Sequence, residues 1–184
     1  MVNGSVLGGL GMKVVARFAG FETYRVVDGV MFCRASDGVE WYDIAKLQAE
    51  EQALHLLING DGMICSLDHD LTRMYPAGFD LVSILEDDSE QPKIGDFVEI
   101  KGNELTVVMP PRHILEARAE SMRQKRLSTI QEKISPLEDA EKLGIISDSE
   151  RASLTALQLY RVALYRLPQS AGWPTDVIWP DAPR

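Results

Sequence analysis

Residues 23–34 read TYRVVDGVMFCR, two apolar runs on either side of the pair Asp28-Gly29. A two-residue Asp-Gly connection is favoured in β-hairpins, because both central positions need positive φ, which glycine adopts freely and aspartate tolerates. The stretch therefore predicts an antiparallel hairpin and indicates that the surrounding part of the chain is built from strands.

Short strands and turn signals continue outward from this hairpin, from Met12 to Pro110. Because no long helical pattern separates them, they favour an antiparallel sheet over parallel strands with crossover helices. The one helix expected here covers residues 45–52, and the acidic run 86–90 (EDDSE) is expected to be a linker. The further signals are a turn at 36–38 leading into VEWYDI, a hairpin LHLLI-NGDG-MICSLD centred on 59–62, a turn at 76–78 before the strand FDLVSIL, and a hairpin DFVEIK-GN-ELTVVM.

A different pattern begins after Pro110-Pro111. Between 112 and 134, apolar residues recur in steps of three and four, as on one face of a helix. Ser135-Pro136 predicts that a helix restarts or is kinked there, and Gly144 predicts the end of that helix. The sequence Ser147-x-x-Glu150 predicts a capping box that begins another helix, which ends at Pro168. Because the connection between Gly144 and Ser147 is short, the two helices are predicted to pack as an antiparallel hairpin. The apolar positions are Leu115, Ala119, Met122, Leu127, Ile130 and Ile134 in the first helix and Leu154, Leu157, Tyr160, Leu164 and Leu167 in the second.

The predicted fold class is therefore α+β, with a β-rich domain over 12–110 and a helical hairpin with an extended, Pro- and Trp-containing tail over 111–184. Residues 1–11 are glycine-rich and are expected to form a flexible leader. The apolar stripe over 112–134 has to be covered either within the chain or by a second copy, which leaves self-association through the helical region open.

Composition excludes several classes of function. The 184 residues carry 19 basic and 28 acidic side chains, a net charge of −9, and 45% are hydrophobic, enough for a packed core. So acidic a chain is poorly suited to phosphate backbones or anionic membranes, and no run approaches the roughly 18 to 20 apolar residues of a membrane span. Neither nucleic acid nor membrane insertion is expected, and Cys33 and Cys65 are expected to be reduced core thiols.

No motif indicates catalysis, a cofactor or a metal site. Asp68-His69-Asp70 is the nearest approach to a ligand set, but adjacent turn residues rarely converge on one ion without a further ligand. An enzymatic function would rest on this triplet alone, so we predict that the chain is not an enzyme.

Two other features have both a structural and a functional interpretation. The aromatic residues Trp41, Tyr42, Tyr75 and Phe79 lie near turns and belong either to the core or to an interface. The basic residues between Arg112 and Arg126 form either a solvent-exposed helix face or a contact with an acidic partner, for which the run 86–90 is one candidate.

Residues 134–183 resemble the C-terminal signature of tail fibre assembly proteins of tailed phages. The resemblance rests on Ser135-Pro136-Leu137, on Tyr160-Arg161-Val162, and on Trp179-Pro180. More loosely, SDGVEWYDI (36–44) and YPAGFDLVSI (75–84) are similar to Mu-like and P2-like members. The chain departs from the pattern at Leu157 and Gln158, where many members have tryptophan.

The resemblance implies a chaperone that binds the C-terminal, distal region of a phage tail fibre and assists its trimerisation in the host cytoplasm. The alternative is a permanent fibre-tip component that contributes to recognition of a host surface glycan, in which case the protein stays on the virion. The predicted fibre-contacting residues are Trp41, Tyr42, Tyr75 and Phe79, and those organising the C-terminal motif are Tyr160, Arg161, Trp173 and Trp179.

Overall fold

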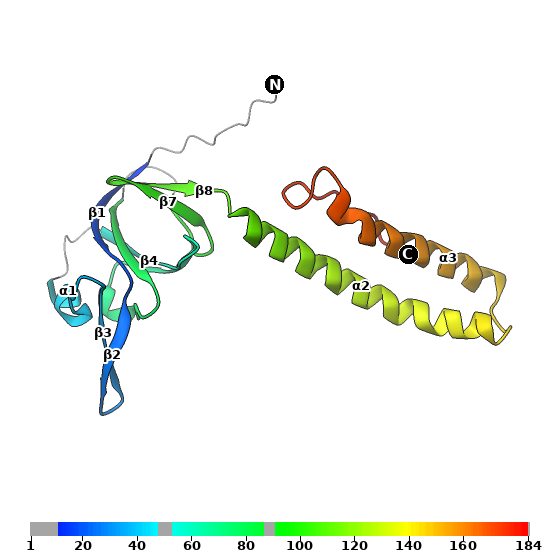
Figure 1. Cartoon of the computed structure of the whole chain (residues 1–184), viewed down its shortest axis with the longest axis horizontal. Coiled ribbons are helices and arrows are strands. Elements are labelled where there is room, and N and C mark those ends of the chain that lie inside the picture. The colour runs from blue at the N-terminus through cyan, green and yellow to red at the C-terminus, as the bar shows by residue number, and fades with distance from the viewer. Residues whose placement is uncertain (1–10, 48–52, 87–90, 184) are drawn as a thin grey trace, which may run out of the picture. The chain divides into compact units, whose positions relative to one another are not determined.

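The computed structural model describes residues 11–47, 53–86 and 91–183. It divides into two compact units, Met1–Pro110 and Pro111–Arg184, whose elements are labelled in Figure 1. The first unit is β-rich and the second helical, so the predicted α+β class is confirmed. Most of the predicted leader, residues 1–10, lies outside the described residues.

The first unit contains a six-stranded antiparallel sheet of order β5-β4-β6-β1-β8-β7 and a separate two-stranded hairpin, β2-β3. The hairpins predicted around 28–29, 59–62 and 102–103 all form, and Asp28 and Gly29 have the positive φ values that their turn requires. The strands are β1 Met12–Phe18, β2 Glu22–Val27, β3 Val30–Arg34, β4 Ala53–Ile58, β5 Ile64–Asp68, β6 Asp80–Leu85, β7 Phe97–Lys101 and β8 Glu104–Val108.

The two edges of the six-stranded sheet meet at one corner. Met63, just before β5, bridges to Phe97 at the start of β7, and the Val98 amide donates to the Gly62 carbonyl at 2.8 Å. Gly62 has φ +83°, and a Cβ there would lie 2.9 Å from the Val98 carbonyl oxygen. Only glycine satisfies both the backbone conformation and this close approach.

Strands β4 and β6 are buried on both faces and separate two apolar cores. Alternate residues such as Leu56 and Val82 face the core inside the curved sheet, while Leu57 and Leu81 pack on the other side. That second core is covered by the base of the β2-β3 hairpin, by α1 (Trp41–Leu47) and by the 3-10 turn η1 (Leu71–Arg73). The sheet therefore anchors the hairpin.

The helix predicted over 45–52 was placed wrongly. Helix α1 begins at Trp41, where the Glu40 carbonyl accepts hydrogen bonds from the Asp43 and Ile44 amides. Trp41, Ile44 and Ala45 are all buried, at the i, i+3, i+4 spacing of a helix that packs one face on a core. Residues 48–52 lie outside the described part of the chain.

The second unit consists of α2 (Arg112–Lys142) and α3 (Asp148–Arg166), followed by the 3-10 turn η2 (Leu167–Gln169). Of the predicted restart or kink at Ser135-Pro136, the restart is wrong, because α2 runs through Pro136 without ending. Pro136 is exposed, so water can reach the carbonyl that its missing N–H leaves free, and Ser135 donates to the Gln131 carbonyl instead of capping a new helix.

The predicted capping box at the start of α3 is confirmed. Ser147 Oγ accepts from the Glu150 amide at 3.3 Å, and the Glu150 carboxylate accepts from the Ser147 amide at 2.8 Å. The hydrogen bond from the Ser147 amide holds the pKa of the Glu150 carboxyl below its ordinary value.

The two helices pack side by side in Figure 1 around a shared core. Much of the predicted stripe on α2 is covered within the chain, since Leu127, Ile130 and Ile134 pack on α3, whereas Met122 remains exposed. Self-association stays a prediction. Residues 171–175 form turns, and from the segment that follows η2 the side chains of Trp173, Val177 and Trp179 pack against the same core.

Candidate binding surface

The β2-β3 hairpin projects from the rest of the N-terminal unit in Figure 1. Its residues near the turn are apolar and exposed. Val26, Val27, Val30 and Met31 are all exposed, Val26 by 60% and Met31 by 45%. In the described part of the chain, β2 and β3 form a two-stranded sheet with no third strand, and an isolated bridge from Arg34 to Glu40 at the base of β3 lies outside that sheet. Toward the tip of the hairpin, each strand therefore has an outer edge that is not part of a ladder. Exposed apolar side chains beside open strand edges are typical of a surface that binds another chain.

Beside this hairpin lies a hollow of about 140 Å³, here called the hairpin hollow. Tyr42 and Tyr75 are exposed at it, and the Tyr75 hydroxyl contacts Thr23 Oγ1 at 2.9 Å and Met31 Sδ at 3.1 Å. Val26 is the cross-strand partner of Met31 and therefore lies on the same face of the hairpin. The lining residues are Met31, Cys33, Trp41, Tyr42, Ala45, Thr72, Met74 and Tyr75.

Trp41 has a different position from the other predicted contact residues. Its side chain is only 5% exposed and packs edge-on against Phe21, with ring centroids 5.6 Å apart. It is a core residue that forms part of the floor of the hollow. Phe79 is half-buried against the same core and does not line the hollow. Tyr42 and Tyr75 are thus the two predicted residues that the fold brings together on the surface.

The sequence prediction missed the hairpin's own side chains. Arg25 lies 4.3 Å from the centroid of the Phe32 ring, and Tyr42 packs edge-on against that ring at 5.4 Å. A signal was present, because a half-buried strand alternates apolar and polar residues, whereas Val26-Val27 and Val30-Met31-Phe32 are apolar at consecutive positions on either side of the turn.

The four residues predicted to organise the C-terminal motif all contact the helical unit. Tyr160 is buried between the helices, and its hydroxyl accepts from Arg126 Nη1 at 3.3 Å. Arg161 on α3 donates to Gln131 on α2 at 3.0 Å. Trp173 and Trp179 pack on the helical core, and the Arg126 guanidinium lies 4.5 Å from the Trp179 ring centroid.

The Asp68-His69-Asp70 triplet directs its side chains to separate partners. Asp68 pairs with Arg73 at 3.4 Å, His69 Nε2 lies 3.5 Å from a Glu86 oxygen, and Asp70 accepts from the Thr72 amide. Within the described ranges, no three His, Cys, Asp or Glu side chains come together in a way that could hold a metal ion. Cys33 and Cys65 are both free thiols, the first buried and the second half-buried.

Stability should fall on acidification because of His55. This side chain is buried, with Nδ1 2.8 Å from Ser83 Oγ, and burial holds its pKa below the ordinary 6.5. Below about pH 6.5 the unfolded chain therefore binds a proton that the folded chain excludes, so the free energy of unfolding decreases as pH falls. We expect the melting temperature to drop by a few degrees from pH 7 to pH 5, and His55→Gln to reduce that slope.

The matched control is His113→Gln, at an exposed histidine on α2. Melting curves across this pH range should keep their slope in the control variant. An equal slope in the wild type and in His55→Gln would contradict the assignment.

A β-rich unit that presents an exposed apolar hairpin, followed by a helical unit, has the surface features of a protein that binds other proteins. Among the described helices, none combines the length and apolar composition needed to cross a membrane. Residues 76–184 match the family described as Caudovirales tail fibre assembly protein, lambda gpK, and the chain belongs to that family. The resemblance noted over 134–183 is thereby confirmed.

Two individual relatives with the same description match most of the chain, and a third matches less than half of it. The probable tail fibre assembly protein of Escherichia phage P2 is 25% identical over 162 residues, 84% of this chain and 86% of the relative. Tail fibre assembly protein U of Escherichia phage Mu is 25% identical over 153 residues, 79% of this chain and 83% of the relative. A probable tail fibre assembly protein of Acyrthosiphon pisum secondary endosymbiont phage 1 is 38% identical over 85 residues, 45% of this chain and 54% of the relative.

Proposed function

We propose that this protein is a chaperone that binds the C-terminal, distal region of a phage tail fibre and promotes its trimerisation, through binding alone and without catalysis. The observation that carries the proposal is the exposed apolar hairpin beside the hairpin hollow, in a chain of the tail fibre assembly family. The contacts are made by Val26, Met31, Tyr42 and Tyr75.

The physical need for such a surface follows from how intertwined fibres fold. A fibre chain whose sheets are completed only by two other chains exposes unpaired strand edges and apolar side chains until the three chains have met. Such exposed surfaces promote aggregation. The β2-β3 hairpin has two open strand edges and a cluster of exposed apolar side chains. These can pair with the strand edges of the fibre chain and cover its apolar side chains.

The hairpin is well placed for this role because its base is rigid. Phe21, Cys33 and Ala35, at or beside the hairpin strands, are buried in the core that also holds Trp41. A rigid base lowers the entropy lost when the exposed tip is ordered on a client. The exposed tyrosines add large contact areas with few rotatable bonds, which suits interface hot spots.

The binding step is tested with fragments of the cognate tail fibre protein. We expect the full-length chaperone to retain the C-terminal third of that fibre in a pull-down and not to retain the N-terminal third. Retention of both fragments alike, or of the N-terminal fragment only, would overturn the distal assignment.

A further inference from the structure

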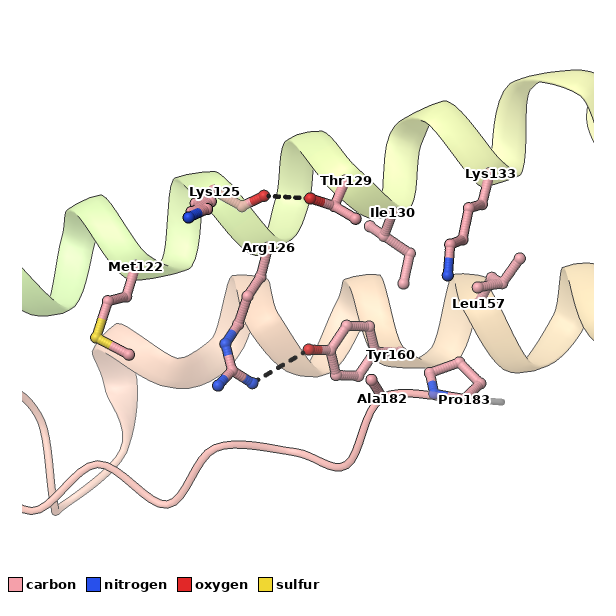
Figure 2. Close-up of a pocket in the computed structure, with 10 residues that line it drawn as sticks. All are labelled: Met122, Lys125, Arg126, Thr129, Ile130, Lys133, Leu157, Tyr160, Ala182 and Pro183. Carbon is pink, nitrogen blue, oxygen red and sulfur yellow. Dashed lines mark hydrogen bonds between the residues drawn. The ribbon is translucent and has the colours of Figure 1, made fainter.

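A cavity lies in the helical unit, between α2, α3 and the end of the C-terminal segment, as Figure 2 shows. Its volume is about 540 Å³. We call it the helical groove. None of its lining residues belongs to the β2-β3 hairpin or to the hairpin hollow. The lining residues are Met122, Lys125, Arg126, Thr129, Ile130, Lys133, Leu157, Tyr160, Ala182 and Pro183.

The floor of the helical groove is apolar. Ile130 and Leu157 are buried side chains that face each other from α2 and α3, and the Tyr160 ring continues this surface. Met122 lines one end while remaining exposed. An apolar floor open on one side leaves space for a branched aliphatic side chain of a ligand.

The rim of the groove is cationic in an otherwise acidic protein. Lys125, Arg126 and Lys133 line it, and no aspartate or glutamate is among the lining residues, although the chain as a whole carries a charge of −9. A cluster of positive charge on a protein whose net charge is negative attracts an anionic ligand.

The lysines of the rim are available for such a ligand. In the described part of the chain, neither Lys125 nor Lys133 forms an ion pair, whereas Arg123 pairs with Glu120 at 2.6 Å and Arg112 with Glu116 at 2.9 Å. The third cation is already engaged, because Arg126 donates to the Tyr160 hydroxyl and lies over the Trp179 ring. Arg126 therefore shapes the wall, and the two lysines remain for charge recognition.

The spacing of the lysines indicates the form of the ligand. Lys125 and Lys133 are eight residues apart on one face of α2, which corresponds to about 12 Å along the helix axis. In an extended peptide, residues i and i+4 are about 13 Å apart and project to the same side as residue i+2. Two acidic residues at that separation would meet the two lysines, with the residue midway between them over Ile130 and Leu157.

We propose that the helical groove binds an extended acidic peptide segment of the pattern acidic–x–apolar–x–acidic. Each acidic side chain pairs with one lysine, and the central apolar side chain enters the floor. The partner is thus a protein with such a segment exposed.

The test uses full-length protein and a fluorescein-labelled peptide containing glutamate–serine–leucine–serine–glutamate, followed by fluorescence anisotropy. We expect saturable binding that weakens as salt is raised, because exposed ion pairs are screened. Replacing both lysines in Lys125→Glu/Lys133→Glu should weaken binding at least tenfold. The matched control is Lys142→Glu, an exposed lysine near the end of the same helix and outside the groove, which should bind as the wild type does.

Peptide variants test the same assignment without altering the protein. Serine in place of the central leucine, or glutamine in place of both glutamates, should each weaken binding at least fivefold. Equal affinity for all three peptides, equal affinity of the double variant and the wild type, or no binding of the first peptide at millimolar concentration would overturn the proposal. Binding of octanoate but not of the peptide would overturn it too, identifying a site for small amphipathic anions.

Discussion

Replacing Trp41 by alanine is expected to lower the free energy of unfolding of the N-terminal unit by about 3 to 5 kcal/mol, the usual cost of deleting a large aromatic from a core. Trp41 is 5% exposed and packs edge-on against Phe21 beneath the hairpin. Its loss would leave a cavity bordered by α1 and the hairpin base. Chemical denaturation followed by circular dichroism measures the change.

The neighbouring residue provides the control. Tyr42→Ala removes an exposed ring that contacts Phe32, so its cost should be about 1 kcal/mol or less. If Trp41→Ala keeps wild-type stability and loses client binding instead, Trp41 belongs to the interface and the packing assignment made here is wrong.

The second large effect concerns the face of the hairpin that carries Val26 and Met31. The double variant Val26→Lys/Met31→Lys places two charges among exposed apolar side chains while keeping the strands paired, so the fold should survive. Loss of a single interface hot spot costs about 2 kcal/mol or more, which is about a thirtyfold change in affinity, and we therefore expect at least about a thirtyfold weaker affinity for the distal fibre fragment. Titration calorimetry or anisotropy with that fragment gives the affinity.

The N-terminal unit offers a closely matched control. Val107→Lys/Met109→Lys changes the same residue types at similar exposure, 45% and 66% against 60% and 45%, at and just beyond β8 and away from the hairpin. This control should bind the fragment as the wild type does. An equal loss of affinity in both double variants would mean that charge in general, and not the hairpin surface, decides binding.

The parts of the fold that follow from local signals could be predicted from the sequence. Asp28-Gly29 specified its hairpin because the turn needs two positive φ values, and Ser147 with Glu150 specified the start of α3 through two reciprocal hydrogen bonds. The order of the strands could not be predicted, because β1 pairs with β6 and β8 through contacts distant in sequence.

The errors have local physical causes as well. Pro136 indicated a break, but at an exposed position the lost hydrogen bond can be replaced by water and α2 continues. Trp41 was predicted to contact the fibre because it lies near a turn, with the core as the alternative, and its burial and its spacing from Ile44 and Ala45 are those of a helix packed on a core. The helical groove could not be predicted from the sequence, because Lys125 and Lys133 line it together with Leu157 and Pro183, which lie far along the chain.

The central claim is tested most directly by co-expressing the C-terminal segment of the cognate fibre protein with and without this chain, and measuring the yield of soluble trimer by size-exclusion chromatography with light scattering. The proposed chaperone function predicts abundant trimer in its presence, and aggregated or monomeric fibre in its absence. An equal yield of soluble trimer in both cultures would contradict it.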